Sequence, residues 1–141
     1  MICAFRDKHS YVSPKGRVKC MATILIIDDS RTSRKVLKNL LEAEGHKIIA
    51  EAANGEEGIS KFKEFSPDIV TMDITMPVMD GVEALKKIRE IDEHAKVVMV
   101  TAASQAYKMR AAIENGASEF LAKPFAPEQI AEIINRVSET L

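Results

Sequence analysis

The sequence predicts an α/β fold in which one parallel sheet lies between two layers of helices. Short runs rich in β-branched residues alternate with longer segments of helical periodicity, and the alternation repeats five times. Several of the short runs are apolar over most of their length, as is typical of strands covered on both faces. The 141 residues are enough for one domain.

Five segments are predicted to be strands. They are short, contain β-branched residues and end at polar or turn-forming residues, and they cover 23–27, 47–52, 68–72, 96–100 and 119–122. The first, third and fourth are the most apolar, which favours burial on both faces.

A helical segment follows each strand. The apolar residues predicted to face inward are, in chain order, Val36, Leu37, Leu40, Leu41, Ile59, Phe62, Val82, Leu85, Ile88, Ile91, Ala106, Met109, Ile113, Ile130, Ile133, Ile134 and Val137. Gly45, Ser66-Pro67 and Asn115-Gly116 are predicted to end the first, second and fourth helices.

Right-handed crossovers between parallel strands restrict how such a sheet can wind. We expect a three-layer, doubly wound (βα)5 sheet that is flavodoxin-like, with strand order 2-1-3-4-5. This order is adopted from known folds of that type, because the alternation of strands and helices alone does not fix it. Ligands in these sheets bind beyond the carboxyl ends of the strands.

Charged and polar side chains stand at four of these ends. Asp28 and Asp29 follow the first strand, Asp73 the third, Thr101 the fourth and Lys123 the fifth. Two like charges about 4 Å apart repel by roughly 4 kcal/mol in a protein-like medium. Either one acid is protonated, therefore, or a cation lies among the three carboxylates.

The ligand types favour Mg²⁺ as that cation. Oxygen ligands without nearby Cys or His suit a hard ion, and few carboxylates with room for water or phosphate suit Mg²⁺ better than Ca²⁺. Lys123 and Thr101 would suit the oxygens of a phosphoryl group. Asp73 is the best candidate nucleophile, since it is central and a carboxylate can form an aspartyl phosphate.

Together these motifs resemble the receiver domain of two-component response regulators. They are Ile27-Asp28-Asp29, Asp73 with Met76-Pro77 and Asp80-Gly81, Thr101-Ala102, Gly116-Ala117 and Lys123-Pro124-Phe125. Each is weak alone, but their joint order and spacing are specific. The resemblance covers the chain from Thr23 onward, so residues 21–141 are predicted to form a receiver domain. Since the chain ends with the fifth helix, the resemblance is closest to single-domain, CheY-like members.

The resemblance implies a metal and acceptor site. Asp73 would be the phosphoacceptor, and Mg²⁺ would be bound by Asp29, Asp73 and the backbone carbonyl of Thr75, with Asp28 acting mainly through water. Lys123 would pair with the phosphoryl oxygens.

The resemblance also implies a switch. The Thr101 hydroxyl would turn toward the phosphoryl group, and the aromatic ring of Phe120 would rotate inward as Thr101 moves. Thr75 and Ala103 lie where the family tunes the phosphoryl lifetime, and the Lys123-Pro124 bond is expected to be cis.

The implied partners are a histidine kinase and a downstream target protein. Chemotaxis, with the flagellar motor switch as target, is the first choice of pathway, and a phosphorelay or another stand-alone regulator comes second. A cytoplasmic monomer without nucleic-acid or membrane binding is expected. It would catalyse its own phosphorylation and dephosphorylation without being a turnover enzyme.

Residues 1–20 differ from the rest of the chain. They contain five basic residues and one acid, whereas 15 basic and 20 acidic residues follow. They are predicted to form a flexible N-terminal extension. Both cysteines, Cys3 and Cys20, lie there, so no disulfide or thiolate metal site is expected in the body, which suits a reducing cytosol.

Other interpretations remain open from the residues alone. Asp28-Asp29 could be a solvated turn with a helix cap, and Asp80-Gly81 could be only a turn. A phosphatase of the haloacid-dehalogenase type would need its nucleophile after the first strand, and a flavodoxin-type FMN binder would need a hydroxyl-rich loop there. An adaptor that binds partners without phosphorylation is a third alternative.

Overall fold

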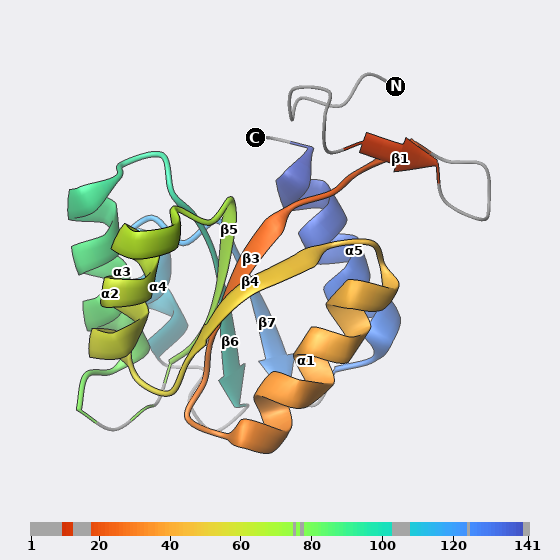
Figure 1. Ribbon diagram of the computed structural model, residues 1–141. Helices are drawn as coiled ribbons and strands as arrows, with labels where there is room; N and C mark the ends of the chain where they lie inside the picture. Colours follow the sequence, from red (N-terminus) through yellow and green to blue (C-terminus); the bar gives the residue numbers. More distant parts are fainter. Residues whose placement is uncertain are drawn as a thin grey trace.

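A five-stranded parallel sheet forms the centre of the protein, as predicted (Figure 1). The computed structural model describes residues 10–12, 18–74, 76, 78–102, 108–123 and 125–139. The sheet strands are β3 (Thr23–Ile27), β4 (Lys47–Ala52), β5 (Ile69–Asp73), β6 (Lys96–Ala102) and β7 (Glu119–Lys123). Their order is β4-β3-β5-β6-β7, and all neighbours are parallel, so the predicted order 2-1-3-4-5 is confirmed.

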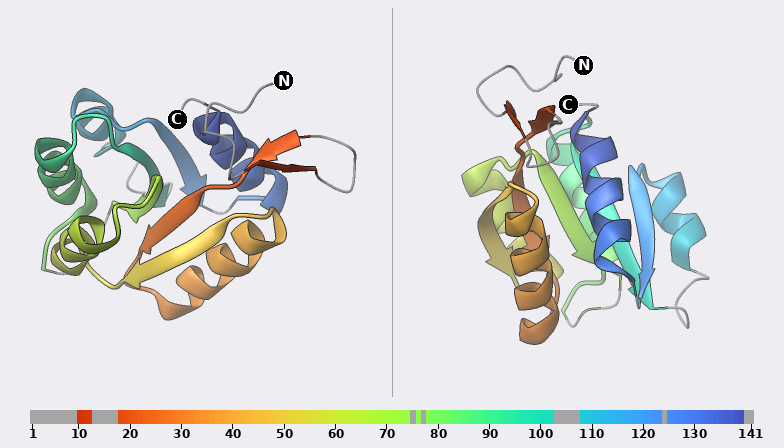
Figure 2. Two further views of the ribbon diagram at one scale, coloured as in Figure 1. Left: turned by 45° about the horizontal axis from the view of Figure 1, so that its top comes forward. Right: turned by 90° about the vertical axis from the view of Figure 1, so that its right-hand side faces the viewer.

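Helices cover both faces of this sheet (Figures 1 and 2). They are α1 (Arg31–Ala43), α2 (Gly55–Phe65), α3 (Gly81–Ile91), α4 (Met109–Glu114) and α5 (Pro127–Ser138). α1 and α5 lie on one face and α2, α3 and α4 on the other. The predicted three-layer, doubly wound architecture is therefore confirmed.

The core consists of two apolar clusters, one on each face of the sheet. Because successive strand side chains point to opposite faces, Leu25 and Ile27 pack toward α2 and α3 while Ile24 and Ile26 pack toward α1 and α5. All four side chains are buried. This burial on both faces explains why β3 is apolar throughout.

Three residues that were predicted to face inward are exposed instead. Val36 is 49% exposed, Ile91 43% and Ile113 52%. In α1 the buried positions are Leu37 and Leu41, so the buried stripe is narrower than the predicted one. Ile91 is the last residue of α3, and α4 is a helix of only six residues. Ala106 lies outside the described residues.

Three of the four strands that carry the candidate site, β5, β6 and β7, are longer at their carboxyl ends than predicted. β5 includes Asp73, β6 includes Thr101, and β7 includes Lys123. In the sheet register Asp73 is opposite Val100, and Thr101 is opposite Ala122. Hydrogen bonding in the sheet therefore extends to the site residues, and their backbones share its regular geometry.

Side chains at the sheet rim start three of the helices. Ser30, Asn54 and Asp80 occupy the N-cap positions of α1, α2 and α3, and each accepts a hydrogen bond from a backbone N–H three residues later. The Asp80 carboxylate accepts from the Glu83 N–H at 2.9 Å. Asp80 is thus a helix cap and more than the turn residue that the sequence suggested.

The N-terminal extension contributes a two-stranded antiparallel ribbon, which the sequence did not predict. β1 (Ser10–Val12) pairs with β2 (Val18–Cys20), and β2 lies beside α5. The flexibility expected for residues 1–20 stays a prediction. Within the described ranges, no helix has the length and apolar character needed to cross a membrane.

Candidate functional site

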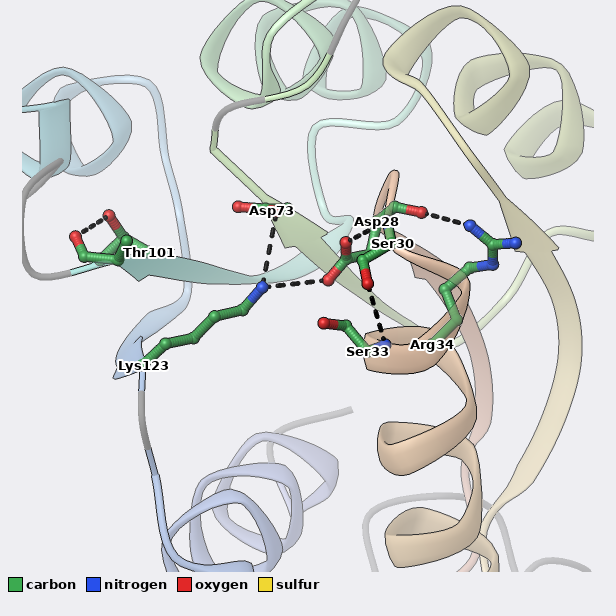
Figure 3. Close-up of polar contacts among 8 residues, drawn as sticks. Asp28, Ser30, Ser33, Arg34, Asp73, Thr101 and Lys123 are labelled. Carbon is green, nitrogen blue, oxygen red and sulfur yellow. Dashed lines mark hydrogen bonds and ion pairs between the residues drawn. The ribbon is translucent and has the colours of Figure 1, made fainter.

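The carboxyl ends of β3, β5, β6 and β7 bring the predicted site residues to one rim of the sheet (Figure 3). The side chains of Asp28, Asp73 and Lys123 point toward one another there. Asp28 follows β3 directly, and the parallel pairing of β3 with β5 places it next to Asp73. Asp28, Asp29, Asp73 and Lys123 therefore converge as predicted, whereas the Thr101 hydroxyl is hydrogen-bonded to the Ala102 carbonyl.

Three carboxylates could hold a metal ion at this rim. Asp28, Asp29 and Asp73 each offer an oxygen, and these three oxygens lie within 4.8 Å of one another. Asp28 is buried, Asp73 is partly buried and Asp29 is exposed, so the cluster opens to solvent on one side. All-oxygen ligands with an open side fit Mg²⁺, which keeps several waters in its coordination shell.

Asp28 is the most constrained of the three acids. Its side chain is 3% exposed, Oδ1 accepts a hydrogen bond from the Ser30 N–H at 2.8 Å, and Oδ2 lies 3.2 Å from the Lys123 Nζ. Its backbone N–H donates to the Ala52 carbonyl, and its own carbonyl accepts from Arg34. Both carboxylate oxygens therefore have protein partners, and the expectation that Asp28 contacts a metal mainly through water stays a prediction.

Lys123 provides the positive charge among these acids. Its Nζ is 3.2 Å from Asp28 Oδ2 and 3.6 Å from Asp73 Oδ2. Burial lowers the pKa of the ammonium, but the charges of Asp73 and Asp28 and their hydrogen bonds raise it, leaving the pKa above its ordinary 10.5. Lys123 is therefore a cation throughout the physiological range, as a group that pairs with phosphoryl oxygens must be.

This raised pKa predicts how stability depends on pH in the metal-free protein. Above pH 10.5 the unfolded chain loses the Lys123 proton while the folded protein still retains it, so the stability that Lys123 contributes should decline through this window. Unfolding in urea, with a chelator present, should be measured from about pH 9 to about pH 12, which brackets the ordinary pKa of a lysine. A Lys123→Met variant is the control, because it lacks the Lys123 ammonium while its other lysines titrate as they do in the wild type.

The difference in unfolding free energy between wild type and Lys123→Met should shrink as the pH rises. A difference that stayed constant or increased over the same window would contradict the assigned ion pairs.

The two predicted switch residues occupy contrasting environments. Thr101 is fully buried, and its hydroxyl donates to the Ala102 carbonyl at 3.1 Å. Phe120, on the neighbouring β7, is 40% exposed. The Thr101 hydroxyl is thus hydrogen-bonded to the backbone, and the Phe120 side chain is partly exposed to solvent.

Three expectations fall outside the described residues. They concern the Thr75 carbonyl as a metal ligand, Ala103 as a residue that tunes phosphoryl lifetime, and the isomer of the bond before Pro124. Each stays a prediction.

Sequence reasoning missed the structural roles of two residues that support the site. Gly81 begins α3 against the end of β5, where its N–H donates to the Ile74 carbonyl at 2.6 Å. A side chain at this position would overlap the Asp73 carbonyl oxygen and lie 2.8 Å from the Ile74 Cα. The sequence placed Asp80-Gly81 in one motif with Asp73 and predicted a turn at the pair, but it did not predict that the glycine packs against the Asp73 backbone.

Arg34 is the second residue that was missed. Its Nη1 donates to the Asp28 carbonyl at 2.6 Å, and its Nε lies 3.3 Å from Glu51 Oε1. A basic residue on an exposed helix carries no sequence signal for such a contact, since its long side chain can reach many acceptors.

Comparisons with known proteins agree with this geometry. The family model described as "Response regulator receiver domain" matches residues 24–135. Chemotaxis protein CheY of Thermotoga maritima is 44% identical over 116 residues, which are 82% of this chain and 97% of that protein. Chemotaxis protein CheY of Bacillus subtilis is 46% identical over 113 residues, covering 80% of this chain and 94% of that protein.

Solved structures agree as well. A CheX–CheY–BeF3–Mg complex from Borrelia burgdorferi contains a chain that is 36% identical, with a TM-score of 0.79 over 87% of this chain and 91% of that one. The family match, the curated relatives and the shared fold lead to one conclusion: the chain belongs to the response regulator receiver domain family.

Proposed function

We propose that this protein is a cytoplasmic response regulator that accepts a phosphoryl group on Asp73 from a histidine kinase and then signals by binding another protein. The observation that carries the proposal is the approach of Lys123 to both Asp73 and Asp28 at a rim where three carboxylate oxygens lie within 4.8 Å. A carboxylate nucleophile, a fixed ammonium and an acidic cation site are the groups that phosphoryl transfer to an acid requires.

In the proposed reaction an oxygen of the Asp73 carboxylate forms a new bond to phosphorus. The P–N bond of a phosphohistidine, or the P–O bond of a small acyl phosphate, breaks, and the leaving group departs with the bonding electron pair. Lys123, 3.6 Å from Asp73 Oδ2, stabilises negative charge on the phosphoryl oxygens. Mg²⁺ bound at Asp28, Asp29 and Asp73 would supply further charge neutralisation.

The proposed output is a shift between two conformations. A phosphoryl group on Asp73 offers the Thr101 hydroxyl a stronger acceptor than the Ala102 carbonyl, since hydrogen bonds to charged groups are stronger than those to neutral ones. As Thr101 turns, Phe120 rotates inward and changes the surface formed by α4, β7 and α5. Water then hydrolyses the acyl phosphate and returns the protein to its starting state.

Chemotaxis is the pathway that we propose first. Relatives at 44% and 46% identity are chemotaxis proteins, and a similar CheY was solved with Mg and the partner CheX. These similarities support a divalent cation, a protein partner and a motility role, with the flagellar motor switch as the first target to test. Membership of the receiver family argues against the phosphatase alternative, because a receiver domain is not a turnover enzyme.

Chemical phosphorylation tests the central proposal. Wild-type protein incubated with acetyl phosphate and Mg²⁺ should gain the mass of one phosphoryl group, and borohydride reduction followed by peptide mapping should place the modification at Asp73. A chelator should prevent the gain. Modification of a different residue, or an equal rate without a divalent cation, would refute the proposed chemistry.

Replacing Asp29 by asparagine should weaken Mg²⁺ binding. The exchange removes one negative charge from the acidic cluster and leaves an exposed side chain of the same size. Losing a residue that only supports a metal ligand lowers metal affinity about 10-fold. Since Asp29 is proposed to bind the metal directly, we expect the affinity for Mg²⁺ to fall by at least that factor. Isothermal titration with MgCl₂ measures it, with Asp92→Asn as a control, because Asp92 is an exposed residue at the end of α3. Equal affinity in both variants would remove Asp29 from the site.

A further inference from the structure

The Arg34 guanidinium joins three separate parts of the protein. Arg34 lies in the first half of α1 with a side chain that is 16% exposed. Its Nη1 donates to the backbone carbonyl of Asp28 at 2.6 Å, and its Nε forms an ion pair with Glu51 of β4 at 3.3 Å. Figure 3 shows Arg34 on the side of the acidic residues opposite Lys123. The β3–α1 turn, the start of α1 and the edge strand are thereby connected.

The Asp28 carbonyl belongs to the turn that presents both Asp28 and Asp29. β3 ends at Ile27, and the last hydrogen bond from this segment to β4 is donated by the Asp28 N–H to the Ala52 carbonyl. Beyond that point the Asp28 side chain is held by the Ser30 N–H and by Lys123, and the Asp28 carbonyl is held by Arg34. Loss of the Arg34 contact would therefore leave the peptide between Asp28 and Asp29 less constrained.

Glu51 compensates the charge of Arg34, but the helix dipole and a nearby cation site both oppose a positive charge at this position. The first turn of α1 contains no acidic residue, and cations near a helix N-terminus are opposed by the helix dipole. A guanidinium close to a cation site also repels the cation. If Arg34 influenced a bound cation through its charge alone, removing Arg34 would therefore strengthen Mg²⁺ binding or leave it unchanged.

We propose that Arg34 is a positioning residue for the divalent-cation site: it holds the Asp28 carbonyl, and Glu51 holds Arg34. This inference rests on the proposed function, because it concerns the same cation site. Arg34 contacts the Asp28 carbonyl and Glu51 and is not one of the three acids that could hold the metal. It acts by fixing the turn on which the Asp28 and Asp29 carboxylates stand.

Arg31 provides a matched comparison on the same helix. Arg31 and Arg34 line the same groove beside β4, together with Lys35 and Lys38. Within the part of the chain that the structure describes, the Arg31 side chain makes no hydrogen bond or ion pair, and it is exposed. Replacing either arginine by methionine removes one positive charge and keeps a long apolar stem, but only Arg34→Met removes the contact with Asp28.

The sign of the change in Mg²⁺ affinity distinguishes an effect of the Arg34 charge from an effect of Arg34 on the position of the turn. If charge alone matters, both variants should bind Mg²⁺ as tightly as wild type or more tightly. If Arg34 positions the turn, Arg34→Met should bind about 10-fold more weakly, as is typical when an outer partner of a metal ligand is lost, while Arg31→Met should not. Titration of each protein with MgCl₂ by calorimetry measures this difference.

A second measurement does not depend on Mg²⁺. In the metal-free protein, amide hydrogen exchange of Ser30, whose N–H donates to Asp28 Oδ1, should be faster in Arg34→Met than in wild type and unchanged in Arg31→Met. Thermal melting in chelator confirms that each variant is folded. If Arg34→Met fails to fold, Arg34→Gln, which keeps a polar side chain too short for both contacts, takes its place.

Equal Mg²⁺ affinity of the Arg34 and Arg31 variants, or unchanged exchange at Ser30, would overturn the positioning role. Those outcomes differ from failure of the proposed function, in which the wild-type protein itself would bind no Mg²⁺ and accept no phosphoryl group.

Discussion

Asp73→Asn should lose phosphorylation by acetyl phosphate, with a rate lower by about a thousandfold or more, equivalent to roughly 4 kcal/mol in the activation barrier. An amide at this position has the shape of the carboxylate but lacks the anionic oxygen that attacks phosphorus. The fold should persist, because Asp73 is only partly buried and Lys123 keeps its 3.2 Å contact with Asp28. Intact-mass spectrometry over a time course measures the rate.

Asp92→Asn is the matched control for this experiment. It makes the same chemical exchange at an exposed site and should be phosphorylated at the wild-type rate. If Asp73→Asn gained the phosphoryl mass as fast as Asp92→Asn, the acceptor would be another residue. The three-acid cluster would then be only a cation site.

Gly81→Ala should have the largest effect on the fold around the acceptor. The new Cβ would overlap the Asp73 carbonyl oxygen and lie 2.8 Å from the Ile74 Cα, both backbone atoms that cannot turn away as a flexible side chain could. Overpacking typically costs about 1–3 kcal/mol, and because the overlap is with backbone atoms we expect a cost above the roughly 1 kcal/mol that alanine offers over glycine in a helix. We expect a lower free energy of unfolding, measured in urea.

The same displacement should slow the reaction of Asp73. Acetyl phosphate labelling should be compared at a temperature where Gly81→Ala and wild type are both folded, so that a slower rate reports an altered site and not an unfolded fraction. Glu83→Ala is a suitable control, because Glu83 lies in the same first turn of α3 with an exposed side chain. Wild-type stability together with wild-type labelling in Gly81→Ala would contradict the close packing of α3 against β5.

Much of the fold follows from periodicity in the sequence. The apolar run at 23–27 forms β3, buried on both faces, and Leu37 and Leu41 lie on the buried face of α1, as their spacing predicted. Predictions at helix edges were weaker. Val36 and Ile113 were predicted to lie within the buried stripes, but how each helix rotates against the sheet decides which apolar residues it buries, and both are exposed.

The order of residues along the chain was sufficient to predict that Asp28, Asp29, Asp73 and Lys123 converge, because parallel strands bring their carboxyl ends to one edge and motif spacing marks those ends. The chemical roles of these residues, and the switch role of Thr101, stay predictions. Only the tertiary structure showed that Gly81 must lack a side chain and that Arg34 donates a hydrogen bond to the Asp28 carbonyl. Backbone contacts of this kind depend on how closely a helix approaches a strand and on where a long side chain ends. Neither quantity is encoded in a local pattern of residue types; both arise when separate segments pack.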